Sequence, residues 1–236
     1  MKKFADVYLN IPDKEKMVKF VRELNFQTVA VCISESSQPK DLDKLGEQYG
    51  VKIVRRVNLK PSTVPELMRE LNKWRLNSEL IGVECVSATI ARQAAKDHRV
   101  DLLSFPVQSL RFFDNAEAEL ASKANAALEV IFNSIVRLES RAIPKAIGMP
   151  RRNIATARKY GIPIVGSSGA SNLLEMRAAR DMAAFFQLLG LSVEESLNAF
   201  SRNPLAIIER NQIKLSGEYV GVGVRIIKKG GGRKDG

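Results

Sequence analysis

The sequence predicts one α/β barrel built from seven parallel strands. Short β-rich runs alternate strictly with helix-patterned runs along most of the 236 residues, which is typical of consecutive β-α units. The β-rich runs are apolar throughout, as expected for parallel strands that are covered on both faces. No Gly-x-Gly-x-x-Gly follows the first strand, so a doubly wound dinucleotide-binding sheet is the second choice.

The individual elements follow from hydrophobic spacing and from the residues that end each run. Strands are expected at residues 5–9, 28–34, 52–59, 80–85, 101–105, 127–138 and 162–167. Helices are expected between them at residues 14–25, 40–50, 64–74, 87–98, 115–124 and 151–161. Met17, Val21 and Leu24 illustrate the basis, because their spacing places them on one helical face.

The pattern after the seventh strand is helical over 173–189, 193–200 and 204–210, which adds C-terminal helices to the barrel. A barrel of this length is normally one domain with a large core. We therefore expect a barrel domain over residues 1–211 and a basic C-terminal extension over residues 212–236. Residues 228–236 contain no apolar side chain, which predicts partial disorder of that extension.

The composition favours an anionic partner. Lys and Arg number 37 against 26 Asp and Glu, which gives a formal net charge of +11. Such an excess is typical of nucleic-acid binding, although basic enzymes share it. The segment 137–161 holds seven basic residues and one Glu. A solvated helix face normally mixes both signs, so this segment predicts contacts with backbone phosphates.

The cellular compartment is expected to be reducing. Cys32 and Cys85 each lie within an apolar run, as buried free thiols do. The N-terminus shows no signal-peptide pattern, and no run approaches the roughly 20 apolar residues of a membrane helix. We expect a cytoplasmic protein without a membrane partner.

Residues suited to catalysis are scarce. In a barrel the functional side chains gather at the carboxyl ends of the strands, and Glu84 is the one carboxylate squarely at a strand terminus. The sole histidine, His98, follows a helix and belongs to the opposite rim. Two enzymatic alternatives stay open: a metal-dependent phosphoesterase that uses Asp6, Glu84 and His98, and a Schiff-base enzyme that uses Lys60.

A Gly/Ser turn ends the seventh strand, in the stretch IVGSSGASNLLEMRAARD. Backbone N–H groups of such a turn can hold the phosphate of a metabolite or of a nucleic acid. Asn172 and Glu175 have the spacing of a capping box at a helix start, and Arg177 and Arg180 would then share one helix face. The structural alternative is a surface ion pair between Arg177 and Asp181.

A second basic and aromatic stretch, SFPVQSLRFFD, places Arg111 among Phe105, Phe112 and Phe113. Aromatic rings beside an arginine can stack on nucleic-acid bases. Phenylalanines in a barrel loop are more often core or interface residues, and we favour that interpretation here.

Four stretches together resemble a known family. They are FADVYLNIPDKEKMVKFVRELNF near the start, GVECVSATIARQAAKDHRVDLLSFP in the middle, YGIPIVGSSGASNLLEMRAARDM after it, and NPLAIIERN. From about residue 4 to residue 211 the chain is similar to the archaeal ribonuclease P protein component 3 family, whose eukaryotic counterpart is the thirty-kilodalton subunit of ribonuclease P.

The resemblance implies an imperfect seven-stranded TIM-like barrel related to the polymerase-and-histidinol-phosphatase hydrolases. It implies a subunit of the endoribonuclease that removes 5′ leaders from precursor tRNA, without catalytic residues of its own. The implied partners are the ribonuclease P RNA, precursor tRNA and other protein subunits, one of which pairs with this chain. The RNA is expected to hold the catalytic Mg²⁺, and this chain is expected to bind neither metal nor cofactor.

In the related hydrolases the first strand ends in a His-x-His metal pair, and here Tyr8 and Asn10 stand at those positions. A phenol and an amide replace two imidazoles poorly, so the resemblance implies a dismantled metal site. The resemblance also implies that Arg92, Arg177 and Arg180 contact RNA. Arg111, Arg151 and Arg152 are predicted to bind RNA because of their charge alone.

Overall fold

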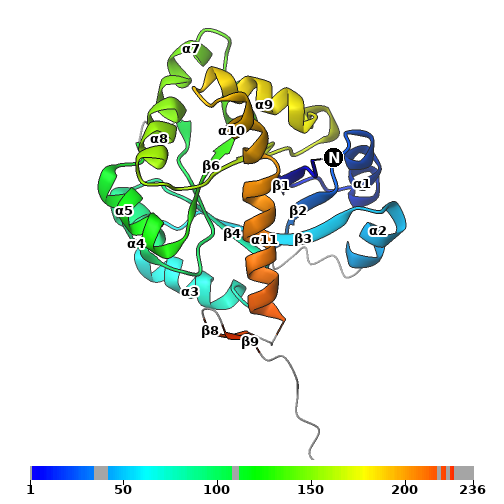
Figure 1. The fold of residues 1–236 in the computed structure, drawn as a ribbon, viewed down its shortest axis with the longest axis horizontal. Coiled ribbons are helices and arrows are strands. Elements are labelled where there is room, and N and C mark those ends of the chain that lie inside the picture. The colour runs from blue at the N-terminus through cyan, green and yellow to red at the C-terminus, as the bar shows by residue number, and fades with distance from the viewer. Residues whose placement is uncertain (1, 35–41, 108–111, 217–218, 222–223, 226–236) are drawn as a thin grey trace, which may run out of the picture.

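Seven parallel strands, hydrogen-bonded in chain order, form the centre of the molecule (Figure 1). The computed structural model describes residues 2–34, 42–107, 112–216, 219–221 and 224–225. Leu9 at the end of the first strand forms a bridge with Ala170 just beyond the seventh, so the sheet closes on itself. The predicted seven-stranded barrel is confirmed. Its strands are β1 Ala5–Leu9, β2 Thr28–Cys32, β3 Lys52–Leu59, β4 Leu80–Glu84, β5 Leu102–Ser104, β6 Ala127–Ile131 and β7 Ile164–Ser167.

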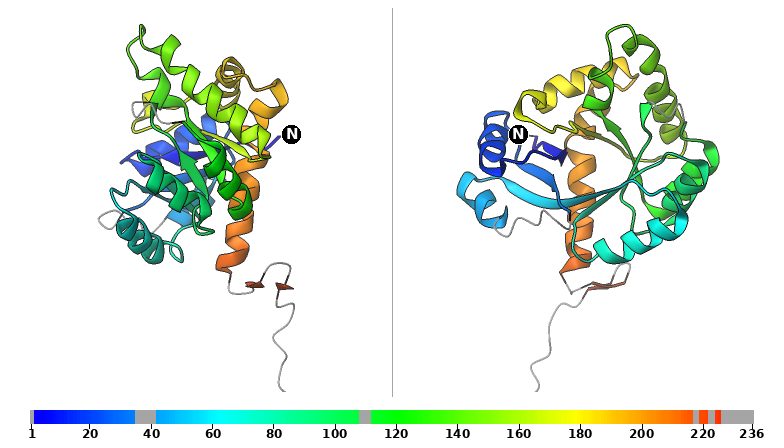
Figure 2. Two further views of the ribbon diagram at one scale, coloured as in Figure 1. Left: turned by 90° about the vertical axis from the view of Figure 1, so that its left-hand side faces the viewer. Right: turned by 180° about the vertical axis from the view of Figure 1, so that it is seen from behind.

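Helices surround the barrel on its outside (Figure 2). Polar side chains begin many of them: Asp13, Thr63 and Ser87 each accept a backbone N–H three residues later, and Asp114 forms a full capping box with Glu117. The helices between the strands are α1 Lys14–Glu23, α2 Leu42–Tyr49, α3 Val64–Trp74, α4 Ala88–Lys96, α5 Asn115–Ala124, α6 Phe132–Val136, α7 Ile143–Ala146 and α8 Gly148–Lys159.

The C-terminal helices pack back onto the barrel. After the 3₁₀ turn η2 Leu173–Glu175 come the helices α9 Ala179–Leu188, α10 Val193–Ala199 and α11 Arg202–Leu215. The short antiparallel strands β8 Tyr219–Gly221 and β9 Val224–Arg225 lie beyond the end of α11 (Figure 1). Helix α11 lies across the amino ends of the strands (Figure 1), where Ile207 and Ile208 join the apolar cluster inside the barrel. The side chain of Asn211 donates to Asp101 Oδ1 at 2.7 Å and fixes the helix there.

Helix α11 runs past the domain boundary that we expect at residue 211, and it ends at Leu215. The segment 228–236, for which the sequence predicts disorder, lies outside the described residues.

Two predicted elements are wrong in extent. The strand expected over 127–138 ends at Ile131 and continues as α6, because the backbone N–H of Asn133 turns aside to bond the Ser168 carbonyl at 3.0 Å. The helix expected over 173–189 is broken: η2 ends at Glu175, and α9 begins only at Ala179. The local spacing of apolar residues predicts one continuous element in each run, but hydrogen bonds to residues distant in the sequence end the first element early.

The barrel interior changes from apolar to polar along the strands. The layer at the amino ends of the strands, next to α11, consists of apolar side chains, among them Val54, Leu80 and Val165. Two positions further along, the buried inward-facing residues are polar: Arg56, Ser104, Glu129 and Ser167. Strand β4 contributes Gly82 to this level, where an added Cβ would lie 2.7 Å from Arg56 Nη2. The small glycine therefore makes room for a large buried cation.

Candidate functional site

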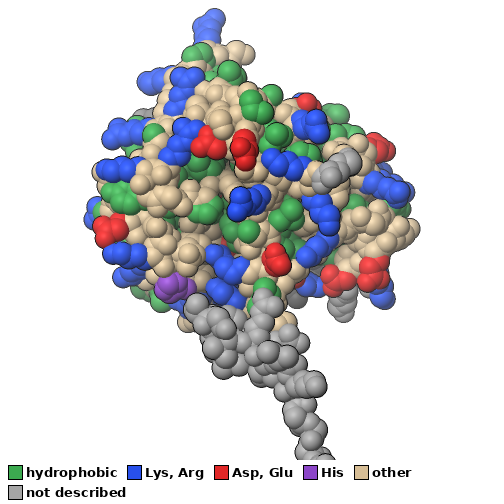
Figure 3. Space-filling model, in the orientation of Figure 1, with side chains coloured by type: hydrophobic (Ala, Val, Ile, Leu, Met, Phe, Trp, Pro, Cys, Tyr) green, Lys and Arg blue, Asp and Glu red, His purple; other side chains and the backbone are tan. Residues whose placement is uncertain are grey.

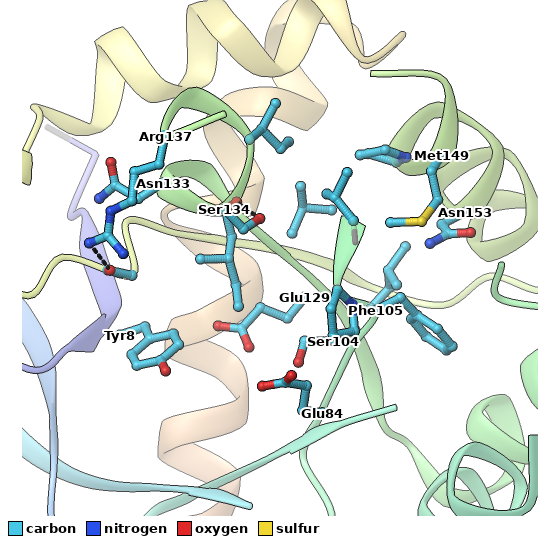
Figure 4. A pocket seen from close by; sticks show the side chains of 18 of the residues that line it. Tyr8, Glu84, Ser104, Phe105, Glu129, Asn133, Ser134, Arg137, Met149 and Asn153 are labelled. Atoms are coloured by element: carbon cyan, nitrogen blue, oxygen red, sulfur yellow. Dashed lines mark hydrogen bonds between the residues drawn. The ribbon is translucent and has the colours of Figure 1, made fainter. Parts of the chain in front are cut away.

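The carboxyl ends of the strands open into a cavity of about 310 Å³ (Figure 4). This is the end of a barrel where functional side chains are expected. The close-up shows Tyr8, Glu84, Ser104 and Glu129 around its lower part, and Met149 and Asn153 of α8 at its side. The cavity thus extends from the polar barrel interior to the basic helix α8.

Glu129 lies at the bottom of the cavity and forms a buried ion pair with Arg56. Arg56 Nη1 and Nη2 lie 2.6 and 2.7 Å from the two carboxylate oxygens of Glu129, and both side chains are fully buried. Arg56 also donates to the Val7 carbonyl at 2.8 Å and stacks over the Tyr8 ring at 4.1 Å. Ser167 Oγ donates to Glu129 at 2.7 Å. Burial opposes the charge on Arg56, but attraction to Glu129 outweighs it and raises the guanidinium pKa.

The positions of the expected His-x-His pair carry no strong metal ligand. Burial raises the pKa of Tyr8 to about 12, so its phenol stays protonated at neutral pH, and its oxygen accepts a bond from Asn58 at 3.1 Å. Asn10 is exposed, and its backbone N–H bonds the Ala170 carbonyl at 2.9 Å. The described residues contain no group of three or more His, Cys, Asp or Glu that could hold a metal ion.

The residues of the phosphoesterase alternative do not assemble into a site, and Lys60 of the Schiff-base alternative lines the cavity in an ion pair with Glu84. Glu84 pairs with Lys60 at 2.8 Å, which neutralises both candidate groups. His98 is exposed just after α4, on the side of the barrel opposite the cavity. Asp6 is fully buried and does not line the cavity. The phosphoesterase set of Asp6, Glu84 and His98 is therefore not brought together.

Asp6 instead anchors the Gly/Ser turn. Its Oδ1 accepts the backbone N–H of Ser168 at 3.0 Å and that of Tyr8 at 3.2 Å, and Oδ2 has no hydrogen-bond partner in the described part of the chain. Desolvation raises the pKa of Asp6 to about 6, although these bonds and nearby Arg56 act in the opposite direction.

The Gly/Ser turn already binds an anion, which is the carboxylate of Glu175 in the same chain. The carboxylate of Glu175 accepts the backbone N–H of Ser171 at 2.7 Å and its hydroxyl at 2.8 Å, and it pairs with Arg137. Partial burial disfavours the charge on Glu175, but the bonds from Ser171 and Arg137 outweigh it and lower the pKa to about 2. The predicted capping box is wrong, since Asn172 makes no side-chain cap bond.

Arg177 and Arg180 do not share a helix face, contrary to the prediction. Arg177 lies in the extended link before α9 and folds back to donate to the Leu174 and Met176 carbonyls at 2.6 and 2.7 Å. Arg180 is in the first turn of α9 and exposed. Among the described residues, no ion pair joins Arg177 to Asp181, so the structural alternative is also wrong.

The basic segment 137–161 forms α7 and α8, and Lys and Arg side chains gather over these helices (Figure 3). Part of its charge is neutralised by acidic residues from other segments: Arg137 pairs with Glu175, and Arg158 pairs with Glu195. Arg151 Nε donates to the Leu188 carbonyl at 2.7 Å, and Arg152 stacks over the Phe112 ring at 4.3 Å. Fewer positive charges of this segment are therefore free of an acidic partner than its seven basic residues predict.

The remaining predicted arginines lie near this segment or cannot be placed. Arg92 of α4 is exposed and lies 3.6 Å from Asp114, which caps α5. Arg111 lies outside the described residues. The structure therefore associates Arg92 and Arg152 with the rim formed by α4, α5 and α8, places Arg151 of α8 against the end of α9, and places Arg177 and Arg180 beside the Gly/Ser turn.

Sequence reasoning missed the buried pair of Arg56 and Glu129. A signal is present in both strands, because Arg56 lies two positions after the buried Val54 in KIVRRVNL and Glu129 lies two positions after the buried Ala127 in ALEVI, so each charge shares a strand face with a core residue. Opposite charges at such positions of facing strands predict a buried ion pair.

Comparisons with known proteins give one family. The family model described as ribonuclease P subunit p30 matches residues 4–215. Ribonuclease P protein component 3 of Methanocaldococcus jannaschii is 26% identical over 187 residues, which is 77% of this chain and 81% of the relative. The Methanosarcina barkeri protein of the same name is 24% identical over 234 residues, 97% of each chain.

Solved structures share the fold. A chain in the cryo-EM structure of archaeal ribonuclease P with mature tRNA has a TM-score of 0.83 at 24% identity, covering 95% of this chain and 99% of its own. A probable 2-pyrone-4,6-dicarboxylic acid hydrolase from Acinetobacter baumannii has a TM-score of 0.55 at 10% identity, covering 88% and 99%. Among the described residues, no helix combines the length and the apolar character needed to cross a bilayer.

Proposed function

This chain belongs to the ribonuclease P subunit p30 family, and from this we propose its function. It is a protein subunit of ribonuclease P that binds RNA and assists the removal of the 5′ leader from precursor tRNA. The archaeal relatives are named ribonuclease P protein component 3, and the structural neighbour comes from an archaeal ribonuclease P with mature tRNA. The proposed partners are the ribonuclease P RNA, precursor tRNA and the other protein subunits.

One observation carries the proposal that this chain assists the reaction and does not perform it. The bidentate pair of Arg56 and Glu129 occupies the barrel interior just below the mouth. Both Glu129 oxygens already accept bonds from Arg56, and the adjacent guanidinium repels a cation. We propose that the RNA holds the Mg²⁺ that supplies the chemistry, and that this chain holds no metal or cofactor.

The proposed RNA contacts are made to backbone phosphates. Exposed arginines suit this role, because their planar guanidinium groups bind phosphate oxygens in pairs. Arg92 and Arg152 lie on one part of the rim, Arg151 lies against the end of α9, and Arg177 and Arg180 lie beside the Gly/Ser turn. Contacts of this type fix the orientation of RNA without reading its sequence.

A cytoplasmic location is part of the proposal. Cys32 and Cys85 form no disulfide, and Cys85 is buried. Reduced cysteines of this kind suit a reducing compartment.

RNA affinity as a function of salt concentration tests the proposed contacts. Replacing Arg92, Arg151, Arg177 or Arg180 singly with Ala should remove about one phosphate contact and reduce the salt slope by roughly one unit. Arg22→Ala is the matched control, since Arg22 is an exposed arginine on α1, across the molecule from α8 (Figure 1). Unchanged slopes in all four well-folded variants would reject this surface as the RNA contact.

A further inference from the structure

One phenylalanine of the loop before α5 differs from its neighbours. Phe105 and Phe113 are buried and pack on each other with their ring centroids 5.3 Å apart. Phe112 is 37% exposed, although it stands beside Phe113 in the sequence. The phenylalanines of this stretch are expected to be core or interface residues; Phe105 and Phe113 are core residues, and Phe112 is not.

The backbone beside Phe112 is held by α8. Asn153 is 3% exposed, and its side-chain oxygen accepts the backbone N–H of Phe113 at 2.9 Å. Arg152 is the residue before Asn153, and its guanidinium carbon lies 4.3 Å from the centre of the Phe112 ring. One buried hydrogen bond therefore fixes the backbone beside Phe112 against helix α8, so less conformational entropy is lost on binding than in a loop without this anchor.

The outer side of this stack is polar and cationic. Arg152 is exposed and, among the described residues, pairs with no carboxylate. Arg151 next to it uses Nε to bond the Leu188 carbonyl. Arg92 is held only loosely, 3.6 Å from Asp114, a residue two positions after Phe112. An exposed aromatic ring, a planar cation and flanking arginines are what a single-stranded nucleic acid requires.

We propose that Arg152 and Phe112 form a stacking platform for one unpaired RNA base, with the flanking phosphates bound by Arg92 and Arg151. The base stacks on the open face of the Arg152 guanidinium, and Phe112 supports the opposite face as a positioning residue. This inference rests on the proposed function in that it assumes RNA as the ligand. It adds that the RNA is single-stranded at this point and that its base takes part.

The competing explanation is a surface cation–π pair that only stabilises the loop. Such a pair stabilises the loop by a similar amount with or without RNA, and a phosphate contact by Arg152 does not depend on the presence of a base. A planar platform, by contrast, distinguishes RNA with a base from RNA without one. The two explanations therefore differ in how the variants respond to an abasic ligand.

Binding of an oligoadenylate of roughly ten nucleotides is compared with binding of an oligoribonucleotide of equal length that lacks bases. Arg152→Lys keeps the charge and loses the plane, and Phe112→Leu keeps an apolar side chain and loses the ring. Arg141→Lys is the matched control, because Arg141 is exposed in the same basic segment. Thermal melting checks that each variant is folded.

We expect each of the two variants to bind oligoadenylate at least about fivefold more weakly than the unchanged chain. Their affinity for the abasic RNA and the affinities of Arg141→Lys should stay within twofold, roughly the reproducibility of such measurements. Equal losses on both RNAs, or no loss on either, would overturn the platform while leaving RNA binding intact. Failure of the unchanged chain to bind either RNA would instead reject the proposed function, and the platform with it.

Discussion

Arg56 and Glu129 join strands β3 and β6 across the barrel interior, with nitrogen–oxygen distances of 2.6 and 2.7 Å and no exposed side-chain surface. The pair stands at the level where the barrel changes from an apolar core to a polar mouth. An isolated charge at this depth would be strongly unfavourable. Each residue therefore depends on the other.

Glu129→Gln should destabilise the fold by about 3–5 kcal/mol, because it leaves the Arg56 charge buried without a counter-ion. Arg56→Met should cost a similar amount for the converse reason. The double variant should cost clearly less than the sum of the two single changes, as for residues in direct contact. Urea unfolding of the four proteins measures these free energies, and additive effects would contradict the pairing.

Gly82→Ala should destabilise the fold by roughly 1–3 kcal/mol, the usual cost of an overpacked core. An added Cβ would lie 2.7 Å from Arg56 Nη2 and 3.0 Å from Asn58 Oδ1. The guanidinium would have to move away from Glu129. Gly148→Ala is a suitable control in the same measurement, since no atom lies within 4 Å of its added Cβ. Equal stability of the Gly82 variant and the control would show that Arg56 is not confined.

The stability of the chain should depend on pH through Asp6. Its pKa is about 6 in the folded protein because of burial, against an ordinary value of 3.8 for Asp. The folded state therefore binds a proton that the unfolded state releases, and stability falls as pH rises from about 4 to about 6, then levels off. Relative to Asp6→Asn, which does not titrate, the unchanged chain should lose about 2–3 kcal/mol over this range.

Measuring unfolding of both proteins in parallel removes the contribution of groups that they share. Glu175 and Glu195 have pKa values of about 2, so their stabilising effect is lost only below about pH 4.5. A difference in stability between the two proteins that is independent of pH would show that Asp6 titrates normally.

Glu175→Ala should turn the Gly/Ser turn into a binding site for an added anion. The change frees the backbone N–H of Ser171 and the Arg137 guanidinium, both of which now bond Glu175. We expect a stability loss of about 0.5–1.5 kcal/mol at pH 7, because Ser171 and Arg137 are exposed and water can replace part of what Glu175 provides. Inorganic phosphate should restore part of it, seen as a rise in melting temperature that the unchanged protein lacks. The absence of any phosphate effect in the variant would mean that this turn does not select anions.

The regular parts of the fold follow from the sequence. Apolar runs such as ADVYL and TVAVC alternate with amphipathic helices, and seven parallel strands in chain order result. Local spacing could not predict that the run 127–138 divides at Ile131, because the cause is a hydrogen bond from Asn133 to the distant Ser168. The break between Glu175 and Ala179 escaped prediction similarly, since Glu175 bonds Ser171 and Arg137 and caps no helix.

The candidate site could be predicted less completely, because a count of basic residues does not show which of them form ion pairs with acidic residues elsewhere in the chain. Arg137 and Arg158 contribute to the basic character of 137–161, yet Glu175 and Glu195 from later segments neutralise them. Tyr8 and Asn10, which stand where the resemblance implies a metal pair, could be identified in the sequence. Which charged groups meet across the barrel depends on strand register and on depth in the interior, neither of which one sequence specifies.

Reconstituted leader removal tests most directly whether this chain assists a catalytic RNA. A ribonuclease P RNA and its other protein subunits are assayed on precursor tRNA over a range of Mg²⁺ concentrations, with and without this chain, and the chain is also assayed alone. We expect cleavage to occur at lower Mg²⁺ when the chain is present, and no cleavage by the chain without RNA. Cleavage of precursor tRNA by the purified chain alone, or an unchanged Mg²⁺ requirement on adding it, would contradict this function.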